Sequence, residues 1–226
     1  MSYKFRMFDQ SKALEVAVRF LADVKREQVS PFLTEFGEWK SYNEEELKNE
    51  LMGCLITPGT RQKFLEEFWK SEDFKKLASA NQEQLQNILF KHKIRFARRK
   101  AESLGKVRTL KVKPFLEKLA PYTGKDLPSE RIARLHFMKY MSVGGFKVTS
   151  LFFKTIGFTK FLAVLDVRNL NFMKKCRLLP SNIHPQTLTQ QNVYYVLESW
   201  ENLLAEKLNV TLPELDTMIC KLMERV

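Results

Sequence analysis

The sequence predicts an all-α protein, and three observations support that prediction. Apolar residues recur at intervals of three and four in nearly every segment, which is the spacing of one face of a helix. The 226 residues include only 8 glycines and 8 prolines, too few for the many turns of a β-sandwich. With 44% hydrophobic and 12% aromatic residues, the chain can bury a sizeable core in one large or two small domains.

The N-terminal third predicts two helices. The first runs from Ser11 to Lys25, and its apolar face consists of Leu14, Val16, Ala17, Phe20 and Leu21. The second begins near Asn43, where three consecutive glutamates suit the positive end of a helix that continues through Leu55. Pro58 and Gly59 end this second helix.

The middle third predicts further helices at 60–69, 81–91, 96–106 and 112–120. A loop at 122–126 leads to Pro128, which opens a helix whose apolar face contains Ile132, Leu135, Met138 and Met141. Residues 142–145 stop that helix and 146–156 form the next, with Gly157 as its C-cap. Because the link is only about four residues long, these two helices form a tight hairpin.

The C-terminal third predicts three helices. An apolar run at 161–165 leads to Asp166, whose short carboxylate is suited to cap a helix at 167–176. An uncharged connector at 178–191 precedes a helix at 192–208, amphipathic through Val193, Val196, Leu197, Trp200, Leu203 and Leu204. Thr211 and Glu214 have the spacing of a capping box before a last helix that carries Leu215, Ile219 and Leu222.

Positive charge is concentrated in two segments. The chain has 38 basic and 26 acidic residues, a net charge of +12. Residues 91–113 hold ten Lys or Arg against one Glu, and residues 147–177 hold seven against Asp166 alone. The two segments therefore indicate a surface for a polyanion, with solvated helix faces as the plain alternative.

The sequence shows no metal-binding or membrane-spanning pattern. Its cysteines and histidines are too dispersed for a disulfide framework, an iron–sulfur cluster or a zinc site: Cys54, Cys176, Cys220, His92, His136 and His184. We expect no metal and no cofactor. The first residues have no apolar signal-peptide core, and the longest uncharged stretch, 178–197, contains two prolines. These features predict a soluble protein of a reducing, intracellular compartment.

The segment 135–172 carries the most informative pattern. A helix, a Gly-Gly hairpin and a second helix place backbone amides at a helix start, where they can bind a phosphate without reading sequence. Lys147 lies in that first turn, beside the positive end of a helix dipole, which favours the neutral amine that a nucleophile requires. Asp166 follows nineteen residues later. The plain alternative is a surface lysine and an ordinary helix cap.

The hairpin with Lys147 and Asp166 resembles the helix-hairpin-helix superfamily of DNA glycosylases. The stretch KVTSLFFKTIG from Lys147 to Gly157 is similar to the archaeal-type (type 2) 8-oxoguanine DNA glycosylase/AP lyases. Three further segments agree, in order: ELMGCLIT at 50–57, IRFARRKA at 94–101 and EKLNVTLPELD at 206–216. The resemblance covers most of residues 45–220.

The resemblance implies two helical subdomains, one over 46–162 and one made of 163–226 packed with 1–45. It also implies a monomer that binds double-stranded DNA containing a damaged base, in the cytoplasm, nucleoid or nucleus. The damaged nucleotide is flipped out of the duplex. Lys147 would attack the sugar, expel the base and form a Schiff base, and β-elimination would then nick the strand. Asp166 would deprotonate the amine or steady positive charge on the sugar.

The resemblance also assigns DNA contacts. Val143, Gly144 and Gly145 would hold a phosphate beside the lesion, and the loop 57–60 stands where relatives insert a residue into the hole left by the flipped base. Four basic residues would contact the DNA backbone or support the lesion pocket: Arg95, Arg98, Arg99 and Lys100.

Three positions depart from the family. Val143 stands where the hairpin usually has glycine, Leu151 where these enzymes often carry histidine, and Cys220 where they place a tryptophan. Leu151, Cys220 and Phe146 would line the base pocket, with Phe152 and Phe153 as further sources of an aromatic ring. The Lys–Asp pair therefore supports the chemistry more strongly than these positions support the 8-oxoguanine specificity.

The sequence leaves two alternatives beside a bifunctional 8-oxoguanine glycosylase. One is a glycosylase for another damaged base. The other is a non-catalytic helix-hairpin-helix module that recognises DNA structure, and such a module would have no use for the Lys–Asp pair. A membrane-surface or RNA-binding helical protein would explain the charge but not the hairpin.

Overall fold

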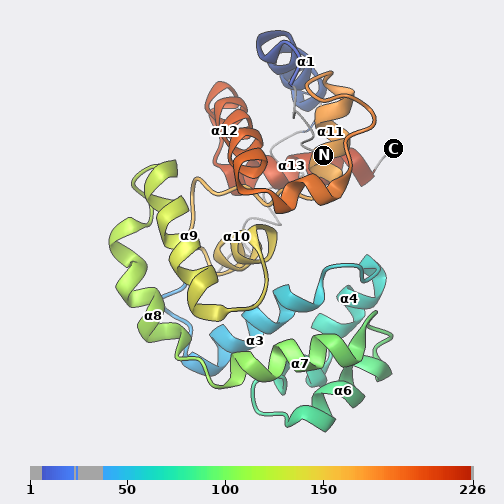
Figure 1. Ribbon diagram of the computed structural model, residues 1–226, viewed down its shortest axis with the longest axis vertical. Coiled ribbons are helices and arrows are strands. Elements are labelled where there is room, and N and C mark those ends of the chain that lie inside the picture. Colours follow the sequence, from blue (N-terminus) through green and yellow to red (C-terminus); the bar gives the residue numbers. More distant parts are fainter. Residues whose placement is uncertain (1–6, 23, 25–37, 225–226) are drawn as a thin grey trace. The chain divides into compact units, whose positions relative to one another are not determined.

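The computed structural model describes residues 7–22, 24 and 38–224, and every regular element in these ranges is a helix (Figure 1). The all-α prediction is thus confirmed for the described chain. Contacts group the described residues into two compact units. Unit 1 takes its residues from Met1–Phe36 and Thr159–Val226, and unit 2 from Gly37–Phe158.

Unit 2 contains eight α-helices and one 3₁₀ turn among its described residues. They are α3 (Glu44–Ile56), α4 (Gln62–Trp69), α5 (Glu72–Lys75), α6 (Gln82–Lys91), α7 (Ala97–Arg108), α8 (Val112–Leu119), η1 (Ala120–Tyr122), α9 (Leu127–Met141) and α10 (Phe146–Thr155). The ends of the predicted helices agree with these bounds to within two residues. The four-residue α5 is absent from the prediction because one turn is too short to show a helical period.

The helix starts of unit 2 follow from short polar side chains. The Asn43 side chain accepts from the backbone N–H of Glu46, and the Glu46 carboxylate accepts from the Asn43 N–H at 2.7 Å. Asn81 and Gln84 make the same reciprocal pair at the start of α6. Each capping box satisfies donors that the first turn of a helix leaves without an intrahelical acceptor.

Aromatic rings form the centre of unit 2 around α9 and α10. The ring centroid of Phe137 lies 5.3 Å from that of Phe152, and the Phe153 ring lies 4.7 Å from that of Phe158. Trp39 closes the cluster edge-on against Phe158. Phe152 and Phe153 are almost wholly buried here, so they are core residues and cannot present a ring to a base from this position.

The apolar face predicted for α9 is partly wrong. Met141 is buried, but the Ile132 side chain is 42% exposed, and the buried stripe instead contains Phe137 with Glu130 and Arg134. Each of the two charged side chains has a hydrogen-bond partner inside unit 2: the Glu130 carboxylate accepts from the Gly124 N–H at 2.9 Å, and Arg134 Nη1 donates to Ser150 Oγ at 2.9 Å. Hydrogen-bonded charged side chains can therefore occupy a face that the sequence pattern gives to apolar residues.

Unit 1 combines a helix from the start of the chain with three from its end. Its described elements are α1 (Gln10–Ala22), α11 (Val167–Lys175), the 3₁₀ helix η2 (Pro185–Thr189), α12 (Gln191–Leu208) and α13 (Leu212–Glu224). Helix α1 packs against α12 and α13, and α11 packs against α13. The predicted end of the first helix, Lys25, lies outside the described residues.

The apolar faces predicted for α1 and α12 are also partly wrong. Phe20, Val196 and Leu203 are all more than 40% exposed. The buried stripe of α12 is wider than predicted and includes Glu198 and Glu201, which are fully buried. In the described part of the chain, no helix is long and apolar enough to cross a membrane, and no group of His, Cys, Asp or Glu could hold a metal ion.

Candidate functional site

The hairpin between α9 and α10 reverses the chain over four residues. Ser142 ends α9 in a left-handed conformation with φ of 52°, and its N–H donates to the Met138 carbonyl at 3.1 Å. Gly144 has φ of 80°, and Gly145 returns to an extended conformation as the N-cap of α10. The two left-handed residues make the turn tight enough to bring the start of α10 beside the end of α9.

The two hairpin glycines differ in their surroundings. A Cβ on Gly144 would lie 3.2 Å from Val148 Cγ1 and 3.4 Å from Leu55 Cδ2, and the positive φ already disfavours a side chain there. A Cβ on Gly145 would meet no atom within 4 Å. Val143 has no positive φ, so the valine that departs from the family pattern occupies a conformation open to any residue.

Lys147 is the second residue of α10 and is half-buried. It lies in the turn whose backbone N–H groups point out of the helix and give its N-terminus a partial positive charge. The Phe146 ring beside it lies under the buried Arg134 guanidinium, with 5.2 Å from the Arg134 Cζ to the ring centroid. Phe146 and Leu151 are half-buried on α10.

Lys100 is buried, unlike the three arginines that precede it. Its ammonium Nζ donates to the Ile56 carbonyl at 2.6 Å, to the Pro58 carbonyl at 2.8 Å and to Thr60 Oγ1 at 2.8 Å. Burial, followed by the positive charge of Arg95, lowers the pKa of Lys100 to about 8. This differs from the expected contact with the DNA backbone, because the ammonium is already bound to loop 57–60.

An exposed aromatic ring stands next to this loop. Phe96 is 58% exposed, has φ of 60° and directly precedes α7. A Cβ on Gly59 would lie 3.4 Å from the Phe96 ring, and the Arg95 guanidinium lies over that ring at 4.8 Å. Arg95, Arg98 and Arg99 are all exposed. Sequence reasoning missed Phe96, although an aromatic residue inside the run IRFARRK is a signal for stacking beside phosphate contacts.

Asp166 lies in unit 1 and caps α11, as the sequence predicts. One carboxylate oxygen accepts from the Arg168 backbone N–H at 2.7 Å, and the other accepts from the Arg168 guanidinium at 3.1 and 3.3 Å. The Asp166 backbone N–H donates to Asn169 Oδ1 at 3.1 Å. Both oxygens of the carboxylate thus act as acceptors.

The predicted site residues divide between the two units. Unit 2 contains the hairpin, Lys147, Phe146, Leu151 and the basic residues of α7, and it brings the hairpin next to Leu55, at the end of the helix that leads into loop 57–60. Unit 1 contains Asp166 and Cys220, and Cys220 is half-buried on α13, which packs against α11.

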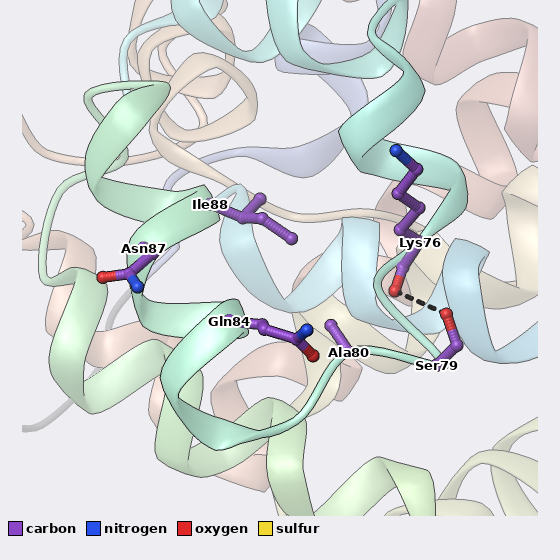
Figure 2. A pocket seen from close by; sticks show the side chains of 6 residues that line it. All are labelled: Lys76, Ser79, Ala80, Gln84, Asn87 and Ile88. Carbon is purple, nitrogen blue, oxygen red and sulfur yellow. Dashed lines mark hydrogen bonds between the residues drawn. The ribbon is translucent and has the colours of Figure 1, made fainter.

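Two pockets lie away from these residues. Figure 2 shows a pocket of about 370 Å³ in unit 2, lined by Lys76, Ser79, Ala80, Gln84, Asn87 and Ile88. A pocket of about 830 Å³ in unit 1 lies between α1 and the segment that follows α11. Neither of these two pockets contains a predicted site residue.

Comparison with known proteins identifies both a family and a fold. A family model described as 8-oxoguanine DNA glycosylase matches residues 29–210. The Methanocaldococcus jannaschii 8-oxoguanine glycosylase/lyase, solved in complex with a 15mer DNA containing 8-oxoguanine, is 20% identical; the match covers 91% of this chain and 94% of that chain, with a TM-score of 0.73. The 8-oxoguanine DNA glycosylase of Thermotoga maritima is 21% identical over 95% of this chain and 97% of that chain, with a TM-score of 0.72. At these identities the structures establish the shared fold. No curated protein matches the sequence.

Proposed function

Because the chain belongs to the 8-oxoguanine DNA glycosylase family, we propose that it excises the base through a Schiff base on Lys147 and then nicks the strand. Membership of this family makes it a base-excision-repair glycosylase for 8-oxoguanine. What we propose in addition is the lyase step and the roles of the individual residues. The observation that carries the proposal is the place of Lys147 in the first turn of α10, two residues after the N-cap Gly145.

Lys147 would begin the reaction as a neutral amine. Its Nζ attacks the sugar C1′, the bond from C1′ to the base breaks, and the base leaves with that electron pair and takes up a proton. Nζ then loses one proton, the C1′–O4′ bond breaks while O4′ takes up a proton, and the open sugar carries a protonated imine between C1′ and Nζ. Loss of a C2′ proton and breakage of the C3′–O bond release the 3′ phosphate, which is β-elimination, and water finally hydrolyses the imine.

Asp166 would steady the positive charge that develops on the sugar. Both of its oxygens accept hydrogen bonds from Arg168, one from the backbone N–H and the other from the positively charged guanidinium, so the carboxylate is held in one orientation. A fixed anion contributes most when it is already oriented toward developing positive charge. Between the two roles that the resemblance allows, this arrangement favours electrostatic stabilisation over proton transfer.

The DNA contacts would come from the hairpin and from the exposed surface near α7. The backbone at Gly145 has open space above it, which suits the close approach of a phosphate to a helix N-terminus. The exposed guanidinium groups of Arg95, Arg98 and Arg99 would bind further phosphates. Phe96, exposed beside loop 57–60, would stack on a base. We propose, as the sequence predicts, that the protein binds duplex DNA as a monomer.

The test is the variant Lys147→Gln on duplex DNA with a single 8-oxoguanine opposite cytosine. The amide of glutamine is not nucleophilic, so we expect no base excision, no nicking and no adduct on borohydride reduction, while DNA affinity stays within about threefold. Lys139→Gln is the matched control, because Lys139 is an exposed lysine on the neighbouring helix α9. It should trap DNA as the wild type does.

Each other outcome has a distinct meaning. Nicking by Lys147→Gln at the wild-type rate would overturn the assignment of the nucleophile. Excision by the wild-type protein without a trapped adduct would indicate a glycosylase that uses water instead of an amine. Binding without excision or adduct would indicate a module that recognises DNA structure.

A further inference from the structure

A buried polar cluster lies beneath the start of α11 in unit 1. It joins Asn169 on α11, Glu201 on α12 and Asp216 on α13, and all three side chains are at least nine-tenths buried. Burying polar groups is costly unless they are hydrogen-bonded. The cluster lies next to Asp166, the residue that caps α11, and Asn169 is bonded to it.

Asn169 uses both ends of its side-chain amide. Its Oδ1 accepts from the backbone N–H of Asp166 at 3.1 Å, and its Nδ2 donates to Glu201 Oε1 at 3.0 Å and to Asp216 Oδ1 at 3.4 Å. The amide therefore connects the N-cap of one helix to two neighbouring helices. The conformation of Asp166 depends on α12 and α13 as well as on its own helix.

The charge of the cluster is kept low. Burial, followed by the nearby Asp216, raises the pKa of Glu201 well above its ordinary value, while the bond from Asn169 opposes this shift. Glu201 Oε2 is buried without a hydrogen-bond partner among the described residues. The raised pKa favours the neutral carboxyl of Glu201, whose Oε1 still accepts from Asn169.

We propose that Asn169 is a positioning residue for Asp166, and that Glu201 and Asp216 orient its amide for this task. The inference rests on the proposed function, because it assumes that the carboxylate of Asp166 acts in base excision. Asn169 itself contacts the backbone of Asp166, so it acts on the reaction only through the placement of that residue.

The variant Asn169→Ala tests this role. It removes the acceptor for the Asp166 N–H and the donor for both carboxyl groups. We expect the single-turnover excision rate at saturating enzyme to fall on the order of 10- to 100-fold, because small displacements of a reacting group cost that much. The dissociation constant for DNA should change by less than about threefold, since Asn169 is buried and cannot contact DNA.

Gln84→Ala is the matched control. Gln84 stands at the same third helical position of α6, and its Oε1 accepts from the N-cap Asn81 N–H at 2.8 Å. The control loses the same kind of capping bond at a helix with no proposed catalytic residue. Its excision rate, per DNA-binding protein molecule, should equal that of the wild type.

Exchanging the hydrogen-bond donor and acceptor between Asn169 and Glu201 distinguishes a positioning role of Asn169 from a role in packing alone. Asn169→Asp leaves an acceptor for the Asp166 N–H but removes the donor to Glu201 and adds a third acidic group, so excision should fall. Adding Glu201→Gln supplies an amide donor at the other end of the same bond, and most of the lost rate should return. Glu201→Gln alone keeps an acceptor oxygen without charge and should retain activity within about threefold.

The outcomes distinguish this inference from the proposal on which it rests. If Asp166→Asn excises 8-oxoguanine at the wild-type rate, the role given to Asp166 is wrong. If Asp166→Asn is impaired while Asn169→Ala behaves like Gln84→Ala, the positioning role is overturned. If Asn169→Ala fails to fold, the test is the excision rate of Asn169→Asp compared with that of the double variant Asn169→Asp with Glu201→Gln. If the double variant does not recover the lost rate, the positioning role is overturned.

Discussion

Gly144 and Gly145 are adjacent in sequence but impose different requirements on the hairpin. Gly144 combines a left-handed backbone with close contacts to Val148 and Leu55, whereas Gly145 is extended and faces open space. The first glycine is therefore needed for the fold, and the second keeps room at the start of α10. The sequence predicts a hairpin here, but it cannot tell which glycine has which role, because the contact with Leu55 joins residues far apart in the chain.

The matched variants Gly144→Ala and Gly145→Ala test this division. Gly144→Ala should lower the free energy of unfolding by about 1–3 kcal/mol, because it adds backbone strain and crowding. Gly145→Ala should change it by less than about 0.5 kcal/mol, yet weaken DNA binding several-fold if a phosphate approaches this backbone. Urea unfolding and DNA-binding titrations measure the two effects. Equal stability losses in both variants would contradict the division.

Loop 57–60 is held by a helix that lies forty residues away in the sequence. The Lys100 ammonium has three N–H donors, and the loop and the end of α3 offer it three acceptors. A neutral amine has two donors and would leave one bond unmade. The sequence groups Lys100 with Arg95, Arg98 and Arg99 as residues that contact the DNA backbone or support the lesion pocket. Only the packing of α7 on α3 shows that Lys100 points inward.

The variant Lys100→Met tests the loop contact. Its methyl group cannot donate, so the carbonyls of Ile56 and Pro58 and the hydroxyl of Thr60 each lose one hydrogen bond, although Thr60 Oγ1 still donates to the Ile56 carbonyl. The free energy of unfolding should therefore fall by about 1–3 kcal/mol at pH 7. The pKa of Lys100 is about 8 in the folded protein and near 10.5 in an unfolded chain. Between these values the unfolded state binds more protons, so the stability of the wild type relative to the variant should rise from pH 8 to 10. A constant difference in urea unfolding between pH 7 and pH 10 would contradict the assignment.

At the scale of whole helices, local patterns predict most of the fold. Asp166 caps the helix that the sequence assigns to it, and the observed N-caps Asn43, Asn81 and Asp126 lie where the sequence predicts a helix to begin, to within two residues. Buried faces are predicted less well, since Arg134 and Glu201 make hydrogen bonds to groups on other helices, and such partners cannot be read from spacing. For the same reason the hairpin, Lys147 and the Asp166 cap are predictable, while Phe96 and the cluster around Asn169 are not.

The charge of the whole molecule governs its affinity for DNA. A net charge of +12 with an exposed arginine cluster at the start of α7 predicts that binding weakens steeply with salt, because each phosphate contact releases a counterion. Arg99→Ala should reduce the slope of log affinity against log salt by about 0.9, the value for one contact.

Lys118→Ala is the control for the salt experiment, since Lys118 is an exposed lysine on α8 outside both basic segments. It should leave the slope unchanged. Binding measured from about 50 to 200 mM salt tests both variants, and a flat response of the wild-type protein would contradict a role for the basic segments.

The make-up of unit 1 has a consequence for how the protein is synthesised. Helix α1 packs against α12 and α13, so its partners leave the ribosome only after about 170 further residues have been added. Unit 2 is contiguous and can reach its native contacts while the rest of the chain is still being translated. During that interval the apolar face of α1, including the buried Leu14 and Leu21, is without its native cover. Nascent chains halted before residue 191 should therefore be the species that chaperones bind and proteases cleave at the N-terminal end.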